Sequence, residues 1–92
     1  MRPTLVQHHA IEARIGMIVG STDFDRLFSG IEFGDLEAEI LYVFAKDEAC
    51  AAEIEDRFSA HISIIASQIL SRNILFVNVL PKQLSTGNWH AS

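Results

Sequence analysis

Apolar residues between positions 46 and 70 recur at the spacing of a helical turn. At steps of four, four, three and four residues they form one stripe: Ile54, Phe58, Ile62, Ile65 and Ile69. This periodicity predicts a long amphipathic helix that turns the stripe toward a core. Asp47 stands where its carboxylate can accept from the free amide groups of the first turn. Glu53 and Arg57 are four residues apart, which favours an ion pair on the outer face.

Two apolar segments on either side of this helix are typical of strands. Residues 39–45 are apolar on both faces, which predicts a central strand covered on both sides or placed at an interface. Residues 74–80 are likewise apolar on both faces and end at Pro81. Residues 31–33 alternate as in a strand with one buried face, and Gly34-Asp35 is a turn signal. The short connection to residues 39–45 predicts a hairpin.

Two further helices precede the strands. Pro3 suits a first helical turn, and a stripe of Ile11, Ile15, Ile18 and Val19 leads to Gly20, which we expect to cap the helix. Gly16 inside this helix indicates a close packing contact. Residues 21–23 are all good N-cap residues and start a short helix carrying Phe24, Leu27 and Phe28. The expected order is helix, helix, strand, strand, helix, strand.

This order predicts an α+β fold of K-homology-like arrangement, with a three-stranded sheet and helices packed against it. The chain has 92 residues, so we expect one domain over residues 1–81, followed by a flexible tail over residues 82–92. Almost half of the residues, 49%, are hydrophobic, which argues against disorder. The longest apolar run is too short to span a membrane, and one cysteine fits a reducing, cytoplasmic compartment.

Charge is distributed unevenly along the chain. Residues 1–56 carry four basic and all twelve acidic side chains, a net charge of −8, whereas residues 57–92 carry three basic side chains and no acidic one, a net charge of +3. An acidic surface repels phosphate and attracts a basic protein partner, although it can also serve only to keep an apolar domain in solution.

Candidate residues for enzyme chemistry are few. Cys50 has no histidine placed beside it by sequence and is expected to be a small buried side chain. The four histidines, His8, His9, His61 and His90, do not have metal-ligand spacing. There is no glycine-rich phosphate loop. We therefore expect a chain that is not an enzyme and that uses no metal or cofactor.

Two segments resemble the amino-terminal domain of the bacterial replication initiator DnaA. The first is STDFDRLF, residues 21–28, and the second is AKDEACAAEIEDRFSAHI, residues 45–62. The family has an acidic or polar residue before a phenylalanine in a short second helix, and an N-capped main helix with an aliphatic and aromatic stripe. Asp47 matches the cap, and Ile54, Phe58 and Ile62 match the stripe. The resemblance covers roughly residues 5 to 80.

The resemblance implies a protein-interaction module in DNA replication initiation. Domains of this family self-associate, contact the replicative helicase DnaB and receive regulators of initiation. Asp23 and Phe24 match the positions where helicase and regulators bind. Ala49 matches a helicase-contacting position that is typically aromatic in the family, and His8 is nearest to an exposed aromatic used in self-association. The expected partners are therefore a helicase, a regulator, or a second copy in a homo-oligomer.

Three alternatives stay open from the sequence. Phe24 can be a core anchor and Asp23 a cap of the short helix. The chain can resemble DciA, a helicase-loader module of related fold, although DciA proteins tend to be basic. It can also be a weak single-stranded nucleic-acid binder through Arg57, Arg72 and Lys82, although the net charge of −5 opposes such binding and the G-x-x-G loop of K-homology domains is missing.

Overall fold

The computed structural model describes residues 1–82. Its elements, in order, are α1 (Leu5–Val19), α2 (Ser21–Asp23), the π-helical turn η1 (Phe24–Phe28), β1 (Glu32–Glu37), β2 (Ile40–Ala45), α3 (Glu48–Leu70) and β3 (Phe76–Pro81). The predicted α+β class and the order of helices and strands are confirmed. Of the tail expected over residues 82–92, residues 83–92 lie outside the described part of the chain.

Helix α3 has the start and the buried face that its sequence predicts. The backbone N–H of Cys50 donates to the Asp47 carboxylate at 2.8 Å, so Asp47 is the N-cap. Four residues of the predicted stripe are buried, and the fifth, Ile69, is half-buried against the core. Cys50 is also buried, as expected. The stripe is therefore the side of α3 that closes the core.

Helix α1 differs from its prediction at both ends. Pro3 lies before the helix, because Thr4 is the N-cap and forms a capping box with Gln7. Ile11 and Ile15 are buried, but the side chain of Ile18 is 51% exposed and its assignment to the core was wrong. The aromatic ring of Phe24 packs on the side of α1 that carries Gly16, so the buried side of the last turn shifts away from Ile18.

The two glycines of α1 have the expected roles. A Cβ atom at Gly16 would lie 3.6 Å from the Phe24 ring, which is close packing at van der Waals distance. Gly20 has a φ of 84°, and its N–H donates to the Gly16 carbonyl at 3.0 Å. Gly20 therefore ends α1 and turns the chain into α2.

The sheet has the order β1-β2-β3, antiparallel between β1 and β2 and parallel between β2 and β3. The expected turn at Gly34-Asp35 was wrong: β1 continues through both residues with a bulge between Phe33 and Leu36, and the chain reverses at Ala38-Glu39. Gly34 instead permits close approach, because a Cβ there would lie 2.7 Å from an atom of the Phe44 ring. The glycine marks a contact within the sheet rather than its end.

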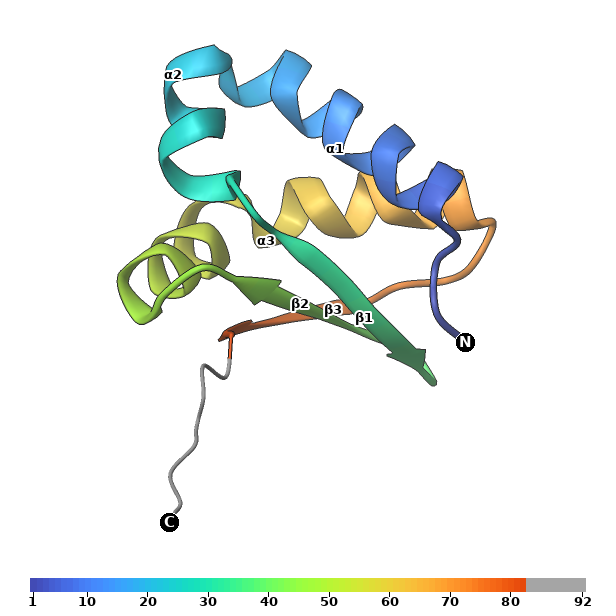
Figure 1. Cartoon of the computed structure of the whole chain (residues 1–92). Coiled ribbons are helices and arrows are strands. Elements are labelled where there is room, and N and C mark those ends of the chain that lie inside the picture. Colours follow the sequence, from blue (N-terminus) through green and yellow to red (C-terminus); the bar gives the residue numbers. More distant parts are fainter. Residues whose placement is uncertain (83–92) are drawn as a thin grey trace, which may run out of the picture.

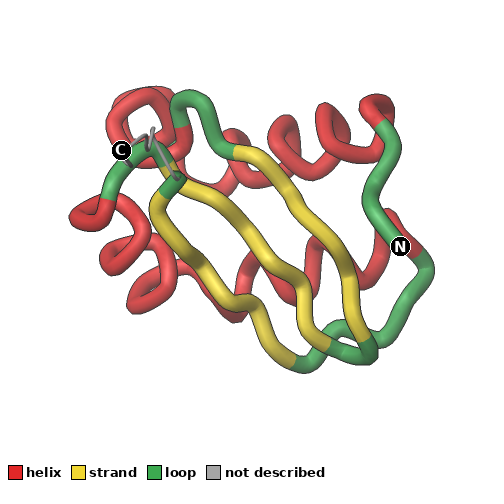
Figure 2. Tube along the Cα trace, turned by 60° about the horizontal axis from the view of Figure 1, so that its bottom comes forward, coloured by secondary structure: helices red, strands yellow, loops and turns green. Residues whose placement is uncertain are grey.

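All helices lie on one side of the sheet (Figure 1). The molecule therefore has two layers: the three strands run side by side in one layer, and the helices lie behind them in the other (Figure 2). The core forms between these layers, where Leu41 and Val43 of β2 are fully buried. The connection from β2 through α3 to β3 makes the parallel pair, since a parallel strand requires a crossover.

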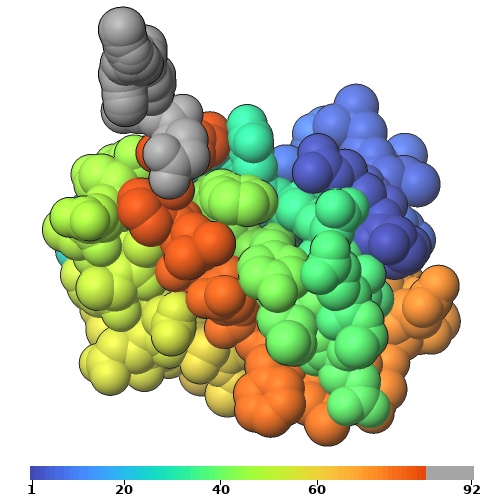
Figure 3. Space-filling view, turned by 90° about the horizontal axis from the view of Figure 1, so that it is seen from below, coloured from blue at the N-terminus to red at the C-terminus, as the bar shows by residue number. Residues whose placement is uncertain are grey.

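The outer face of the sheet is not covered by any element of residues 1–82 (Figure 3). Ile40, Tyr42 and Phe44 are only half-buried there, and Phe76 and Leu80 of β3 are 63% and 38% exposed. The strand at residues 39–45 was expected to be covered on both sides or placed at an interface. Within residues 1–82, helices cover one face of the sheet and no element covers the other.

Candidate protein-interaction surface

Four charged side chains connect the short helix α2 to the middle of α3. We call Asp23, Arg26, Glu53 and Arg57 the ion-pair cluster. Arg26 donates to both oxygens of Glu53, at 3.0 and 2.9 Å, and Arg57 donates to the same carboxylate. Asp23 accepts from Arg26 at 3.2 Å and lies 3.7 Å from Arg57. The forked, two-bond geometry of Arg26 links η1 to α3, and Asp23 extends the cluster to α2.

The cluster alters the acid–base properties of its members. Hydrogen bonds from Arg26 and Arg57 lower the pKa of Glu53 from 4.5 to about 2. Hydrogen bonds to Glu53 and Asp23 raise the pKa of Arg26 above its usual range. All four side chains are partly exposed to solvent. Glu53 and Arg26 are thus charged at neutral pH, and the cluster is accessible to a partner.

Because of Glu53, the free energy of unfolding should depend on pH in the acidic range. Its folded-state pKa lies below 4.5, so its contribution is present above pH 4.5 and is lost as the pH falls through about 2. We expect Glu53→Gln to lower the free energy of unfolding at pH 6 and to make little difference near pH 2. Urea unfolding of both proteins across this range measures the effect.

Glu37→Gln is the control, since Glu37 is exposed on β1 and belongs to no ion pair within residues 1–82. A difference between wild type and Glu53→Gln that stays constant from pH 6 to pH 2 would contradict the assignment.

Phe24 follows Asp23 of the ion-pair cluster and packs against the edge of the core. Its ring stacks on Phe28 with the two centroids 5.7 Å apart, and it is half-buried against Gly16 of α1. A remaining part of the ring faces solvent. Phe24 therefore anchors the short helix, as one sequence alternative had it, and still contributes apolar surface next to Asp23.

Ala49 belongs to the same surface. It is exposed in the first turn of α3, and Glu53 follows it four residues later on the same face of the helix. Arg26 of η1 lies beside this turn, because its carbonyl accepts from the Cys50 thiol at 3.6 Å. We call Asp23, Phe24 and Ala49, together with the ion-pair cluster that joins the α2–η1 segment to α3, the α2–α3 surface.

His8 lies away from the α2–α3 surface. It is half-buried on α1, with Nε2 3.2 Å from Glu12 and its ring edge-on to Phe33 at 4.9 Å. The exposed apolar side chains of α1 are other residues: Leu5, Val6, Met17 and Ile18. The sequence pattern placed Ile18 on the buried stripe and gave no signal for the other three. The helical periodicity of apolar residues identifies the buried side of a helix and gives no signal for a functional exposed side.

The three basic residues of the nucleic-acid alternative lie apart. Arg57 is held by Glu53 and Asp23, and Lys82 lies 3.3 Å from Glu32. Arg72 follows the end of α3, about 20 Å along the helix from Arg57 at 1.5 Å per residue. Carboxylates thus neutralise two of the three cations that would have to contact phosphate.

No group of three or more histidine, cysteine, aspartate or glutamate side chains in residues 1–82 is arranged to hold a metal ion. Burial raises the pKa of the Cys50 thiol, so that it is protonated at neutral pH. Within the same residues, no helix is both long and apolar enough to cross a membrane.

Comparison with known proteins gives a match among solved structures. No model of a protein family matches the sequence, and no curated protein matches it. Among solved structures, the fold is similar to a chain in the "Crystal structure of a HobA-DnaA (domain I-II) complex from Helicobacter pylori", with a TM-score of 0.69 and 15% sequence identity. The alignment covers 84% of this chain and 98% of that chain. At this identity the likeness shows the fold, and the chain therefore shares its α+β fold with a chain of that complex.

Proposed function

We propose that this chain is a non-enzymatic protein-interaction module in the initiation of DNA replication. The observation that carries the proposal is the fold shared with a chain of the HobA–DnaA complex over 84% of this chain and 98% of that chain. The sequence segments 21–28 and 45–62 support it independently, since they resemble the amino-terminal domain of DnaA. Two separate lines thus lead to proteins of replication initiation.

The α2–α3 surface is the part of the domain that we assign to the partner, a replicative helicase or a regulator of initiation. It combines a half-buried aromatic ring, Phe24, with the partly exposed carboxylate of Asp23. Exposed acids adjoin this surface in the chain, since Asp25 follows Phe24 and Glu48 precedes Ala49, whereas both arginines of the ion-pair cluster are already bound to carboxylates. A basic partner surface with an apolar centre would complement this arrangement.

The geometry determines how Asp23 should be changed. A lysine in its place would lie beside Arg26 and Arg57, and repulsion among three cations would disturb the domain itself. Asp23→Asn keeps the shape and removes only the charge. Ala49→Phe is the complementary variant, because residue 49 is exposed and typically aromatic in the family that the sequence resembles.

We expect Asp23→Asn to weaken partner binding by about tenfold, which corresponds to about 1.4 kcal/mol, and Ala49→Phe to strengthen helicase binding. The purified domain is immobilised and the captured proteins of a cell lysate are identified. Binding of the purified helicase or regulator to wild type and variants is then titrated.

Glu37→Gln, on β1, is the matched control for a lost acidic charge. The proposal fails if folded Asp23→Asn binds the helicase and regulators as wild type does, or if neither class of protein binds the wild-type domain. Binding of labelled single-stranded DNA at low salt, lost on changing Arg72 and Lys82, would instead favour the nucleic-acid alternative.

A further inference from the structure

The two edges of the sheet differ in whether their backbone pairs with another segment of the chain. At the outer edge of β1, the chain's first residue pairs with the strand: Leu36 N–H donates to the Met1 carbonyl at 2.6 Å, and the Met1 amino group donates to the Leu36 carbonyl at 3.2 Å. At the outer edge of β3, no strand within residues 1–82 pairs with the backbone. The edge of β3 can therefore accept a further strand.

The direction of the backbone groups of β3 is fixed by its hydrogen bonds. Phe76 N–H and Lys82 N–H donate inward, to the carbonyls of Glu39 and Ala45 next to and within β2. Because successive residues of a strand face opposite edges, Val77 and Val79 direct their N–H and C=O groups outward. Pro81 also faces outward and has no N–H, which ends the accessible edge.

A side chain occupies part of this edge. The Glu55 carboxylate of α3 accepts from the Val79 N–H at 3.1 Å. An incoming strand would place a carbonyl oxygen at this position. Glu55 thus satisfies one edge amide with the same chemical group, an acceptor oxygen, that a bound peptide would supply.

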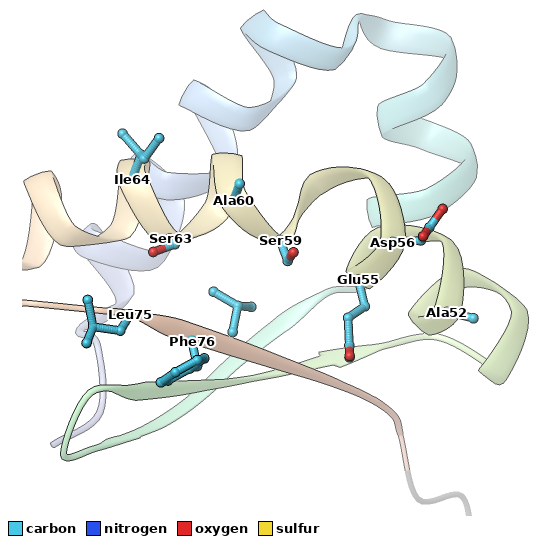
Figure 4. A pocket seen from close by; sticks show the side chains of 10 residues that line it. Ala52, Glu55, Asp56, Ser59, Ala60, Ser63, Ile64, Leu75 and Phe76 are labelled. Atoms are coloured by element: carbon cyan, nitrogen blue, oxygen red, sulfur yellow. The ribbon is translucent and has the colours of Figure 1, made fainter.

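The edge forms one wall of a groove of about 840 Å³ between β3 and α3 (Figure 4). Ile64, Leu75 and Phe76 line it with apolar side chains that are 60%, 54% and 63% exposed. Glu55 and Asp56 make it acidic, and no lysine or arginine lines it. Neither acid takes part in a salt bridge within residues 1–82.

We propose that this groove binds an extended segment of a partner protein, basic and apolar in alternation, as a fourth strand beside β3. The segment's backbone would bond to Val77 and Val79, and its apolar side chains would contact Leu75 and Phe76. Its cations would pair with Asp56 and with Glu55, which is released from Val79 when a peptide carbonyl takes its place. This site is separate from the α2–α3 surface and does not depend on the function proposed there.

Charge favours such a segment over a second copy of this chain. Two copies joined along β3 would bring two sets of Glu55 and Asp56 together without a cation in either groove. Like charges at an interface are unfavourable. A basic peptide removes this repulsion instead of doubling it.

The test uses the full chain and a fluorescent eight-residue peptide of alternating valine and lysine. Two matched peptides serve as controls: one has glutamate in place of lysine, and the other is N-methylated on alternate backbone amides. We expect the lysine peptide to bind and both controls to bind at least about tenfold more weakly, because one lacks charge complementarity and the other lacks ladder hydrogen bonds.

Protein variants and amide exchange locate the binding site. Glu55→Lys with Asp56→Lys should weaken binding of the lysine peptide by about tenfold or more, whereas Asp35→Lys with Glu37→Lys, both exposed on β1 at the opposite edge of the sheet, should have a much smaller effect. Hydrogen exchange at the amides of Val77 and Val79 should slow when the peptide binds.

Three results would overturn the proposal. The N-methylated peptide could bind as well as the unmodified one, which would leave only electrostatic attraction. The exchange of Val77 and Val79 could remain unchanged at saturation. Finally, the amides of Val77 and Val79 could already be protected from exchange in the free full chain. Protection that is lost in a chain cut after Lys82 would assign the groove to residues 83–92. Protection that is lost on dilution to a monomer would assign it to a second copy.

Discussion

Replacing Phe28 with alanine should lower the free energy of unfolding by about 3–5 kcal/mol, the usual cost of removing a buried aromatic ring. Phe28 is 1% exposed and stands at the end of η1, directly before the chain enters the sheet. Its ring stacks on Phe24 and meets Phe58 of α3 edge-on, with centroids 5.7 and 5.6 Å away. The change would leave a cavity between the short helix and α3 and would loosen the α2–α3 surface.

Phe76→Ala is the matched control for Phe28→Ala. The Phe76 ring is 63% exposed, so its removal should change the free energy of unfolding by no more than about 0.5 kcal/mol. Urea unfolding followed by far-ultraviolet circular dichroism gives both values. If the two variants lose similar stability, Phe28 does not have the central packing role described here.

Replacing Ile62 with alanine should cost about 2–5 kcal/mol, the range measured for buried isoleucines. Ile62 is fully buried in the middle of the α3 stripe, against the sheet and α1. Ala66, one turn later, is also fully buried, so a cavity at residue 62 lies deep in the core. Chemical denaturation at neutral pH measures the loss.

Ile64 gives this prediction an internal control. It is the same residue type on the same helix, two positions later, and its side chain is 60% exposed in the groove beside β3. Ile64→Ala should therefore alter stability by about 0.5 kcal/mol or less. Equal losses at the two positions would show that the buried face of α3 is not the one assigned by its periodicity.

The two variants of α3 also separate stability from recognition. Ile64 contributes apolar surface to the groove, so Ile64→Ala should reduce binding of the valine–lysine peptide without unfolding the domain. Ile62→Ala should reduce stability first, and it should affect binding only under conditions in which the domain unfolds.

The candidate surface was predictable only in part. The sequence pointed to Asp23, Phe24 and Ala49 through their likeness to a family, and to the Glu53–Arg57 pair through its spacing of four residues. It gave no signal for the bond between Arg26 and Glu53, which are 27 residues apart in the chain. Contacts across such separations depend on how helices pack. The sequence likewise gave no signal for the groove beside β3, because its two walls come from α3 and from the strand that follows it and meet only when these elements pack together.

By itself, the sequence determined the order of elements and the inner face of the long helix. Apolar side chains must leave water, and the helical period dictates which of them can do so together; hence the stripe from Ile54 to Ile69 was found without coordinates. Capping by Asp47 and Gly20 was also local, because each cap bonds to backbone a few residues away.

Only the tertiary structure decided which apolar side chains stay exposed and which charges meet. Ile18 belongs to a helical stripe yet is exposed because Phe24 packs on another side of α1, and Gly34 continues a strand because the Phe44 ring lies against it. Within residues 1–82 the helices cover one face of the sheet, so apolar residues on the other face and along β3 are left exposed by the described elements. Periodicity describes a segment by itself, whereas burial depends on what packs against that segment.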